Sequence, residues 1–192
     1  MTVATPVLAS RIVGRSRVWA LVGVFSFAAL TAVAAQFSFR IPPIEVPFTL
    51  QTAAVLLSGG VLGARLGASS QLLYVLAGAA GLPVFAEARG GLDVLRGQTG
   101  GYLVGFVIAS YFTGRFAENR HDREVLSGFA AFLIGSLLIY LFGVLGLMAN
   151  LELTFAAAVA NGVVPFVFWD VLKALGAGLL LPAAWKLSGD SP

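Results

Sequence analysis

The stretch PFVFWDVLKALGAGLLLPAAWKL, residues 165–187, is an apolar run of helical length that contains two charges. Asp170 and Lys173 lie where a membrane-spanning helix would meet hydrocarbon. Ionisable groups at that depth are costly, and they tend to be paired and functional. A spacing of three residues puts the two on one face of a helix, where each can partly neutralise the other. The pattern predicts that the function of the chain centres on this pair.

The composition indicates an integral membrane protein. Of 192 residues, 58% are hydrophobic and 11% are charged, and the mean hydropathy is +0.92. Soluble domains carry about 25% charged residues. No polar stretch is long enough for a soluble domain, so we expect a single membrane domain over residues 1–192. Cysteine is absent, and the net charge of +3 gives no indication of nucleic-acid binding. Basic residues of a membrane protein mainly set its topology.

The hydrophobic segments predict an all-α membrane protein with six transmembrane helices. The expected spans cover residues 18–39, 48–65, 67–82, 100–116, 125–149 and 165–187. Three prolines within residues 41–47 forbid a regular helix between the first two spans. The connection 150–164 could hold a short helix at the membrane surface. The second and third spans follow each other almost directly, which predicts a tight hairpin.

The distribution of basic residues predicts that both termini are cytoplasmic. Eight lie on the side of the termini, namely Arg11, Arg15, Arg17, Arg65, Arg115, Arg120, Arg123 and Lys186, and three lie on the other side, namely Arg40, Arg89 and Arg96. An excess of Lys and Arg is typical of cytoplasmic loops. Asp170 and Lys173 then lie about 8 and 12 Å below the outer end of the last span. The topology favours a site loaded from outside, under the segments 41–47 and 83–99.

Several kinds of chemistry are excluded by missing motifs. The chain has no GxxxxGK[ST] loop for ATP, and His121 is its one histidine, so a zinc site is not expected. There is no G-x-S-x-G elbow and no histidine at membrane depth to act as a base. We therefore expect a protein that is not an enzyme and that binds no metal.

Asp170 with Lys173, Gln51 and the charged segment 83–99 each allow a structural and a functional interpretation. Asp170 and Lys173 could be a structural tie between helices, or a binding site for a small polar or anionic solute. The aromatic neighbours Phe166, Phe168 and Trp169 favour binding. Gln51, with Thr49 and Thr52, could bond a neighbouring helix or supply a donor and acceptor to a ligand. The charges of residues 83–99 could be solvated, or together form a glycine-hinged lid.

An alanine row in the first span also has two interpretations. Ala28 and Ala32 make an AxxxA step, which could serve packing within the chain or form a smooth face for a partner subunit.

The sequence resembles the BioY family, the biotin-specific substrate-capture (S) components of energy-coupling factor (ECF) transporters. The resemblance is carried by VPFTLQT at 46–52, LYVLAGAAGLPVF at 73–85, TGGYLVGF at 99–106 and D-x-x-K at Asp170 and Lys173. It covers residues 18–187. The family pattern G-P-T-G-G is altered here by Gln98.

The resemblance implies a multi-pass protein of the bacterial cytoplasmic (inner) membrane with six helices and cytoplasmic termini. Such proteins bind biotin from outside and associate with a transmembrane coupling (T) subunit and two ATPase subunits. These partners hydrolyse ATP, and the S component itself needs no cofactor. The resemblance assigns ligand roles to Asp170 and Lys173 and partner docking to Ala28 and Ala32. Glu87 occupies a position where relatives carry an amide.

Biotin fits the residues singled out above. Asp170 could accept hydrogen bonds from the ureido N–H groups, and Lys173 could donate to the ureido carbonyl or to the tail carboxylate. Phe85, Trp169 and Tyr102 could supply apolar walls. The orientation of biotin stays open. So do two other functions: a self-sufficient secondary transporter of biotin or another small carboxylate, and a structural membrane protein in which the pair only ties helices.

Overall fold

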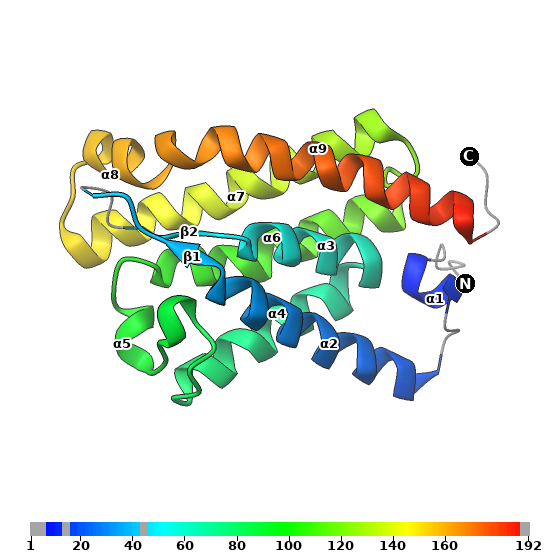
Figure 1. Cartoon of the computed structure of the whole chain (residues 1–192), viewed down its shortest axis with the longest axis horizontal. Helices are drawn as coiled ribbons and strands as arrows, with labels where there is room; N and C mark the ends of the chain where they lie inside the picture. Colours follow the sequence, from blue (N-terminus) through cyan, green and yellow to red (C-terminus); the bar gives the residue numbers. More distant parts are fainter. Residues whose placement is uncertain (1–6, 13–15, 43–45, 189–192) are drawn as a thin grey trace.

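A computed structural model describes residues 7–12, 16–42 and 46–188 of the chain. Within these ranges the protein is a bundle of helices (Figure 1). The longer helices are α2 (Arg17–Gln36), α3 (Gln51–Leu62), α4 (Ala64–Ala79), α6 (Gly100–Glu118), α7 (Val125–Leu151) and α9 (Val164–Leu187). Each of the six segments expected from hydropathy overlaps one of them.

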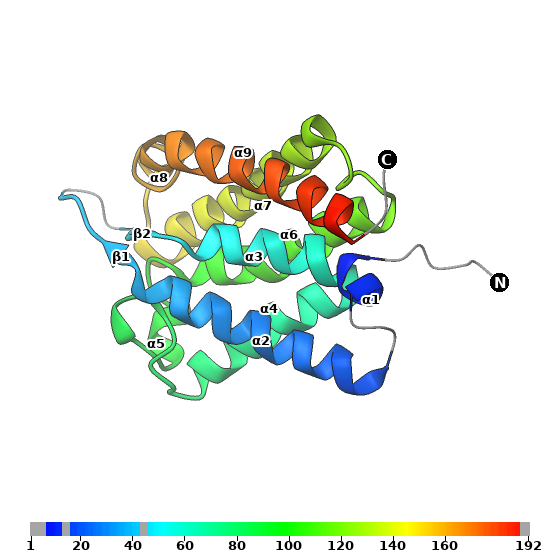
Figure 2. The same cartoon turned by 45° about the vertical axis from the view of Figure 1, so that its right-hand side comes forward.

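Short elements gather at the two ends of the bundle. They are α1 (Leu8–Ile12), β1 (Ser38–Phe39), β2 (Phe48–Thr49), the 3-10 helix η1 (Ala86–Ala88), α5 (Leu92–Leu95) and α8 (Phe155–Gly162). Figures 1 and 2 both place β1, β2, α5 and α8 at one end, and α1 with the C-terminal end of α9 at the opposite end. The segments that the sequence placed on the outer side therefore do lie together.

Three of the described helices are long and apolar enough to cross a membrane: α2, α7 and α9. The fold is thus mostly helical with several apolar helices, as expected for a membrane protein. Helix α3 has 12 residues, which gives a length of about 18 Å against a hydrocarbon core of about 30 Å.

The boundary between the first two predicted spans was wrong. Residues 38–39 and 48–49 were expected to be helical, but they form the antiparallel strands β1 and β2, with Ser38 opposite Thr49 and Phe39 opposite Phe48. Prolines inside the connection prevent a helix from continuing, whereas an extended pair satisfies the flanking backbone groups. The rings of Phe39 and Phe48 stack with centroids 5.1 Å apart, which holds this hairpin closed.

Small residues let the helix backbones approach closely. A side chain on Gly59 of α3 would meet the backbone oxygen of Ser110 in α6 at 2.2 Å, and one on Gly101 of α6 would meet that of Phe142 in α7 at 2.2 Å. Contacts of this type are the main source of helix association in lipid, where there is little hydrophobic drive. They fix α6 between α3 and α7, and α7 packs in turn against α9.

A buried polar cluster connects four helices of the bundle. Gln71 of α4 is fully buried; its Nε2 donates to Thr31 Oγ1 of α2 at 3.2 Å and to Ser58 Oγ of α3 at 3.0 Å. Ser58 also shares a 2.8 Å hydrogen bond with Ser110 of α6. These bonds satisfy polar groups that would otherwise be costly in apolar surroundings, and they fix the register of α2 against α3 and α4.

Ala28 and Ala32 of α2 face inward, whereas Ala29 beside them is exposed. Ala28 is 8% exposed and belongs to the core, and Ala32 is partly buried against it. The exposed face of α2 instead carries larger side chains, including Phe25, Leu30 and Val33. Because α2 packs on α3 and α4, Ala28 contacts other helices of this chain in the present conformation, and its docking role stays a prediction.

A sharp corner joins α3 and α4. Gly63 has a φ of 84°, a left-handed conformation that glycine adopts without strain. Glu118, at the end of α6, accepts a 2.9 Å hydrogen bond from the backbone N–H of Ala64. Leu8 of α1 is buried, and α1 packs against α3. The backbone at this corner is therefore both capped and covered.

The charged link before α7 is partly buried, which its composition did not suggest. Asp122 is 3% exposed and accepts a 2.5 Å hydrogen bond from the indole N–H of Trp185 in α9. Burial raises the pKa of Asp122 above its usual value. Arg123 lies 4.2 Å from the centre of the Trp185 ring. These contacts fasten the C-terminal end of α9 to the link.

Replacement of Gly59 by alanine should destabilise the bundle by about 1–3 kcal/mol, because the new methyl group would overlap the α6 backbone. Gly176→Ala is the matched control: no atom lies within 4 Å of its added Cβ, and alanine favours helix by up to about 1 kcal/mol. Thermal unfolding in detergent measures both. Equal melting temperatures for the two variants would contradict this packing.

Candidate functional site

A cavity of about 710 Å³, including the space at its mouth, opens at the end of the bundle that carries β1 and β2. Its polar lining is Arg40, Thr49, Gln51, Thr52, Glu87, Arg89, Thr99, Asp170 and Lys173. Its aromatic lining is Tyr74, Phe85, Tyr102, Phe106, Tyr140 and Phe166. An apolar wall with a few converging polar groups is the usual composition of a binding pocket.

Asp170 and Lys173 form an ion pair on the wall of this cavity. Helix α9 opens with Pro165, where the missing N–H of proline costs no hydrogen bond. One and two turns later the helix presents Asp170 and Lys173 on one face, with Nζ 2.7 Å from Oδ1. Asp170 is 4% exposed, so the carboxylate is compensated inside the protein rather than by solvent.

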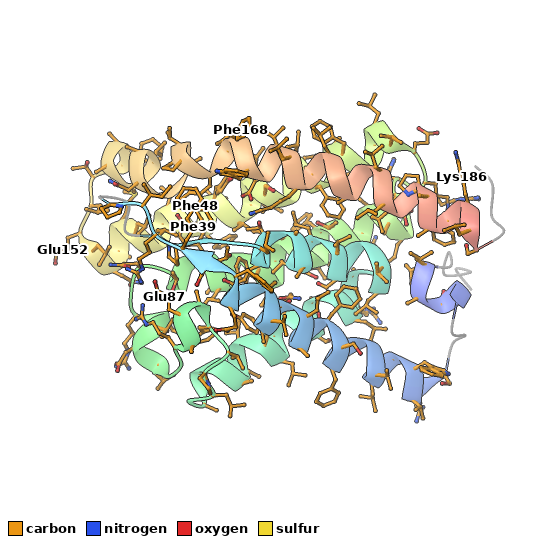
Figure 3. All side chains as sticks on the ribbon, viewed as in Figure 1. Phe39, Phe48, Glu87, Glu152, Phe168 and Lys186 are labelled. Carbon is orange, nitrogen blue, oxygen red and sulfur yellow. The ribbon has the colours of Figure 1, made fainter. Side chains whose placement is uncertain are left out.

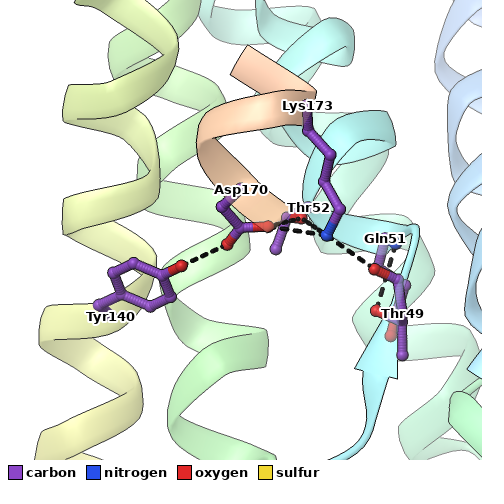
Figure 4. Close-up of polar contacts among 6 residues, drawn as sticks. All are labelled: Thr49, Gln51, Thr52, Tyr140, Asp170 and Lys173. Atoms are coloured by element: carbon purple, nitrogen blue, oxygen red, sulfur yellow. Dashed lines mark hydrogen bonds and ion pairs between the residues drawn. The ribbon is translucent and has the colours of Figure 1, made fainter. Parts of the chain in front are cut away.

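Lys173 uses all three of its ammonium hydrogens within the protein (Figure 4). Its Nζ donates to the backbone carbonyl of Thr49 at 2.8 Å, to Thr52 Oγ1 at 2.9 Å and to Asp170 Oδ1 at 2.7 Å. An ammonium group has three donors and no acceptor. A ligand can therefore bond Lys173 only by replacing one of these partners, and the side chain ties α9 to β2 and to the start of α3.

Asp170 retains one acceptor position. Thr52 Oγ1 and Lys173 Nζ donate to Oδ1, and Tyr140 of α7 donates its hydroxyl to Oδ2 at 2.6 Å. A carboxylate has about four acceptor positions, so three are filled. The carboxylate can therefore accept a hydrogen bond from one N–H group of a ligand. The hydroxyl oxygen of Tyr140 lies beside it and can accept a second hydrogen bond.

Gln51 continues the polar wall toward α4. Its Nε2 donates to the hydroxyl of Tyr74 at 2.6 Å, which leaves the Tyr74 hydrogen available to another acceptor. Gln51 thus bonds a neighbouring helix and lines the cavity at once. The Tyr74 ring meets Phe85 edge-on, with centroids 5.5 Å apart. Phe85 is 2% exposed, and its ring packs against Gly78.

Glu87 lies at the mouth and pairs with Arg40. The guanidinium donates Nε to Oε1 at 2.5 Å and Nη2 to Oε2 at 2.7 Å, and both side chains are 36% exposed. The hydrogen bonds from Arg40 lower the pKa of Glu87 below its ordinary value. Residues 86–88 and 92–95 give the segment 83–99 short helices, and several of its residues line the cavity.

The structure separates the remaining two wall candidates. Tyr102 lines the cavity, and its hydroxyl donates to the Gly162 carbonyl at 2.7 Å. Trp169 was expected in the wall but lies outside the cavity: it is 49% exposed and stacks edge-on against Phe168 on the outer face of α9. Successive helical residues diverge by about 100°, so Trp169 cannot share the inward direction of Asp170.

Sequence reasoning missed Tyr140, Tyr74 and Arg40. Tyr140 is a hydroxyl in the middle of the apolar segment 125–149, a signal of the same kind as Asp170 but weaker. Tyr74 lies within the quoted motif LYVLAGAAGLPVF and could have been found there. Arg40 entered only the tally of charges, because nothing in the sequence brings it next to Glu87. Among the described residues, no group of three or more His, Cys, Asp or Glu side chains could hold a metal ion.

Comparison with known proteins identifies the family. The sequence model of the BioY family matches residues 7–190. The chain belongs to the BioY family. This member is 41% identical over 163 residues to the "Biotin transporter BioY" of Thermotoga maritima, covering 84% of this chain and 92% of the relative. It is 41% identical over 165 residues to the "Probable biotin transporter BioY" of Pyrococcus horikoshii, covering 86% and 93%. These names describe transporters, not enzymes.

A solved structure shares the fold of this BioY family member. The crystal structure of "the S-component for biotin from an ECF-type ABC transporter" aligns with a TM-score of 0.81 over 88% of this chain and 92% of that one, at 21% sequence identity. The resemblance inferred from the sequence motifs is confirmed by the family match, and the helical architecture is that of an S component.

Replacement of Lys173 by methionine should destabilise the protein by about 3 kcal/mol, because Asp170 would be left charged and buried without its counterion. The double variant Asp170→Asn with Lys173→Met should lose less than the single variant, since the unpaired charge is then gone. Lys186→Met, on the same helix but exposed, is the control. Chemical unfolding in detergent gives the three values. If the double variant has a lower free energy of unfolding than Lys173→Met, charge compensation of Asp170 by Lys173 is refuted.

Proposed function

We propose that this protein is the biotin-capture subunit of an ATP-driven transporter of the ECF type in the bacterial cytoplasmic membrane. The observation that carries the proposal is the buried Asp170–Lys173 cluster on the wall of a cavity, in a chain whose relatives are named biotin transporters. Six spans with both termini cytoplasmic put the cavity on the outer side. The excess of basic residues on the side of the termini supports this topology.

Biotin enters with its ureido ring toward Asp170. One ureido N–H takes the fourth acceptor position of the carboxylate, and the ureido carbonyl accepts from Tyr74 or replaces a partner of Lys173. The opposite orientation would bring the tail carboxylate against Asp170, and two carboxylates in a site of low polarity repel strongly. The fused ring then packs among Phe85, Tyr102 and Phe166, and the tail points to the mouth.

Delivery requires partner subunits. The chain lacks a nucleotide-binding loop, so a transmembrane coupling subunit and two ATPase subunits supply the energy, and ATP acts on them rather than on this chain. No cofactor is needed for capture. Segment 83–99 and segment 41–47, of which residues 43–45 lie outside the described part of the chain, gate the cavity between outward loading and release. The coupling subunit contacts α2, where Ala28 and Ala32 become available only if α2 moves from its present packing.

Biotin titration of the purified chain tests capture. Wild type should bind tightly, and Asp170→Asn should weaken binding by about tenfold to a hundredfold, the range for a hydrogen bond to a charged group. Lys186→Met should leave affinity unchanged, because Lys186 lies at the other end of α9. Absence of biotin binding by wild-type chain that melts cooperatively would overturn the proposal.

Uptake into vesicles tests the energy source. With partner subunits present, biotin should accumulate only when their nucleotide sites are intact. Accumulation by this chain alone, unchanged by an inactivated partner nucleotide site, would instead establish a self-sufficient secondary transporter.

A further inference from the structure

The Arg40–Glu87 pair lies at the mouth of the cavity and joins two segments that are far apart in the sequence. Arg40 follows β1, and Glu87 lies in η1, 47 residues further on. Figure 3 shows Glu87 at the end of the bundle that carries β1 and β2, opposite Lys186. Both residues line the cavity. A ligand whose tail reaches the mouth therefore meets a cation and an anion that already bond each other.

Each member of the pair is held in place without the other. The turn with Glu87 is fixed by Gln36 of α2, whose Nε2 donates to the Phe85 carbonyl at 3.2 Å and whose Oε1 accepts from the Ala88 N–H at 3.1 Å. Glu87 and Ala88 have φ of 61° and 54°, a left-handed conformation that persists in such residues only under outside constraint. Arg40 is held by the β1–β2 hairpin and its stacked rings.

Because Arg40 and Glu87 carry opposite charges, the charge on the tail of a ligand affects how strongly that tail binds at the mouth. A guanidinium presents a planar fork that matches a carboxylate, and Glu87 already occupies two of its donors. A carboxylate tail is chemically the same acceptor as Glu87. It binds Arg40 either in place of Glu87 or at other donors of the guanidinium beside it, and in both cases Glu87 repels it. A neutral tail is not repelled by Glu87, and it also gains no ionic contact with Arg40.

We propose that Glu87 competes with the tail carboxylate of the substrate for Arg40, and that this pair sets how strongly the pocket prefers a charged tail to a neutral one. The proposal rests on the proposed function, since it takes biotin as the ligand with its tail at the mouth. Arg40 and Glu87 act as specificity-determining residues, separate from the cluster around Asp170. Glu87 is ionised at neutral pH, as glutamate ordinarily is, and the hydrogen bonds from Arg40 lower its pKa further.

Titration with biotin and with biotinamide, whose tail is neutral but of equal size, tests the pair. The readout is the ratio of the biotinamide Kd to the biotin Kd. Glu87→Gln should raise this ratio about three- to tenfold, and Arg40→Gln should lower it by a similar factor, the range for partly exposed charged contacts. The double variant should fall between the two.

Matched controls come from the same segment of the chain. Asp93 and Arg96 are exposed and lie outside the cavity lining. Asp93→Asn and Arg96→Gln therefore change the charge as the test variants do, but without contact with the tail. Their ratios should equal that of wild type. Equal shifts in the controls would assign the effect to general electrostatics and overturn the proposal.

The outcomes separate this proposal from the one on which it rests. If wild type binds neither compound, biotin capture fails and the selective role of Arg40 and Glu87 fails with it. If both compounds bind and the ratio moves less than twofold in Glu87→Gln, the capture function stands and the selective role is overturned. Should Arg40→Gln fail to fold, Arg40→Lys keeps the charge but loses the fork. An unmoved ratio in that variant together with Glu87→Gln would likewise overturn the selective role.

Discussion

A carboxylate held among apolar helices must be compensated where it lies, and Asp170 imposes this condition on its surroundings. The compensation comes from Lys173 on its own helix, from Thr52 at the start of α3 and from Tyr140 in α7. Lys173 then reaches the carbonyl of Thr49 and so fixes β2. One buried charge thus sets the relative positions of three helices and a hairpin, and it leaves the cavity beside them.

The helices could be predicted because lipid demands long apolar runs, and these are visible in a single sequence. Their ends could not. Strands of two residues have no periodicity to detect, so the pairing of Phe39 with Phe48 appears only when both segments are in place. The inward face of Ala28 was equally hidden, because AxxxA promotes close approach to any helix and does not distinguish a helix of the same chain from one of a partner.

The site residues that could be predicted are charged or polar residues within otherwise apolar sequence. Asp170 and Lys173 stand out in apolar sequence, and Thr49 and Gln51 stand out at the start of a helix. All four line the cavity. Contacts that depend on tertiary structure gave no such signal: Arg40 meets Glu87 across 47 residues. Trp169 was misplaced for a different reason, since nearness in sequence was taken for a shared direction, whereas adjacent side chains of a helix diverge.

The short helix α3 has a consequence for how the bundle meets a membrane. At about 18 Å it is shorter than a hydrocarbon core of about 30 Å, and none of its residues is exposed, so neighbouring helices enclose it. The cap from Glu118 and the cover from α1 let the corner at Gly63 end α3 inside the bundle without bare backbone. A helix enclosed by protein does not have to match the bilayer thickness, so the longer helices around α3 carry that constraint in its place.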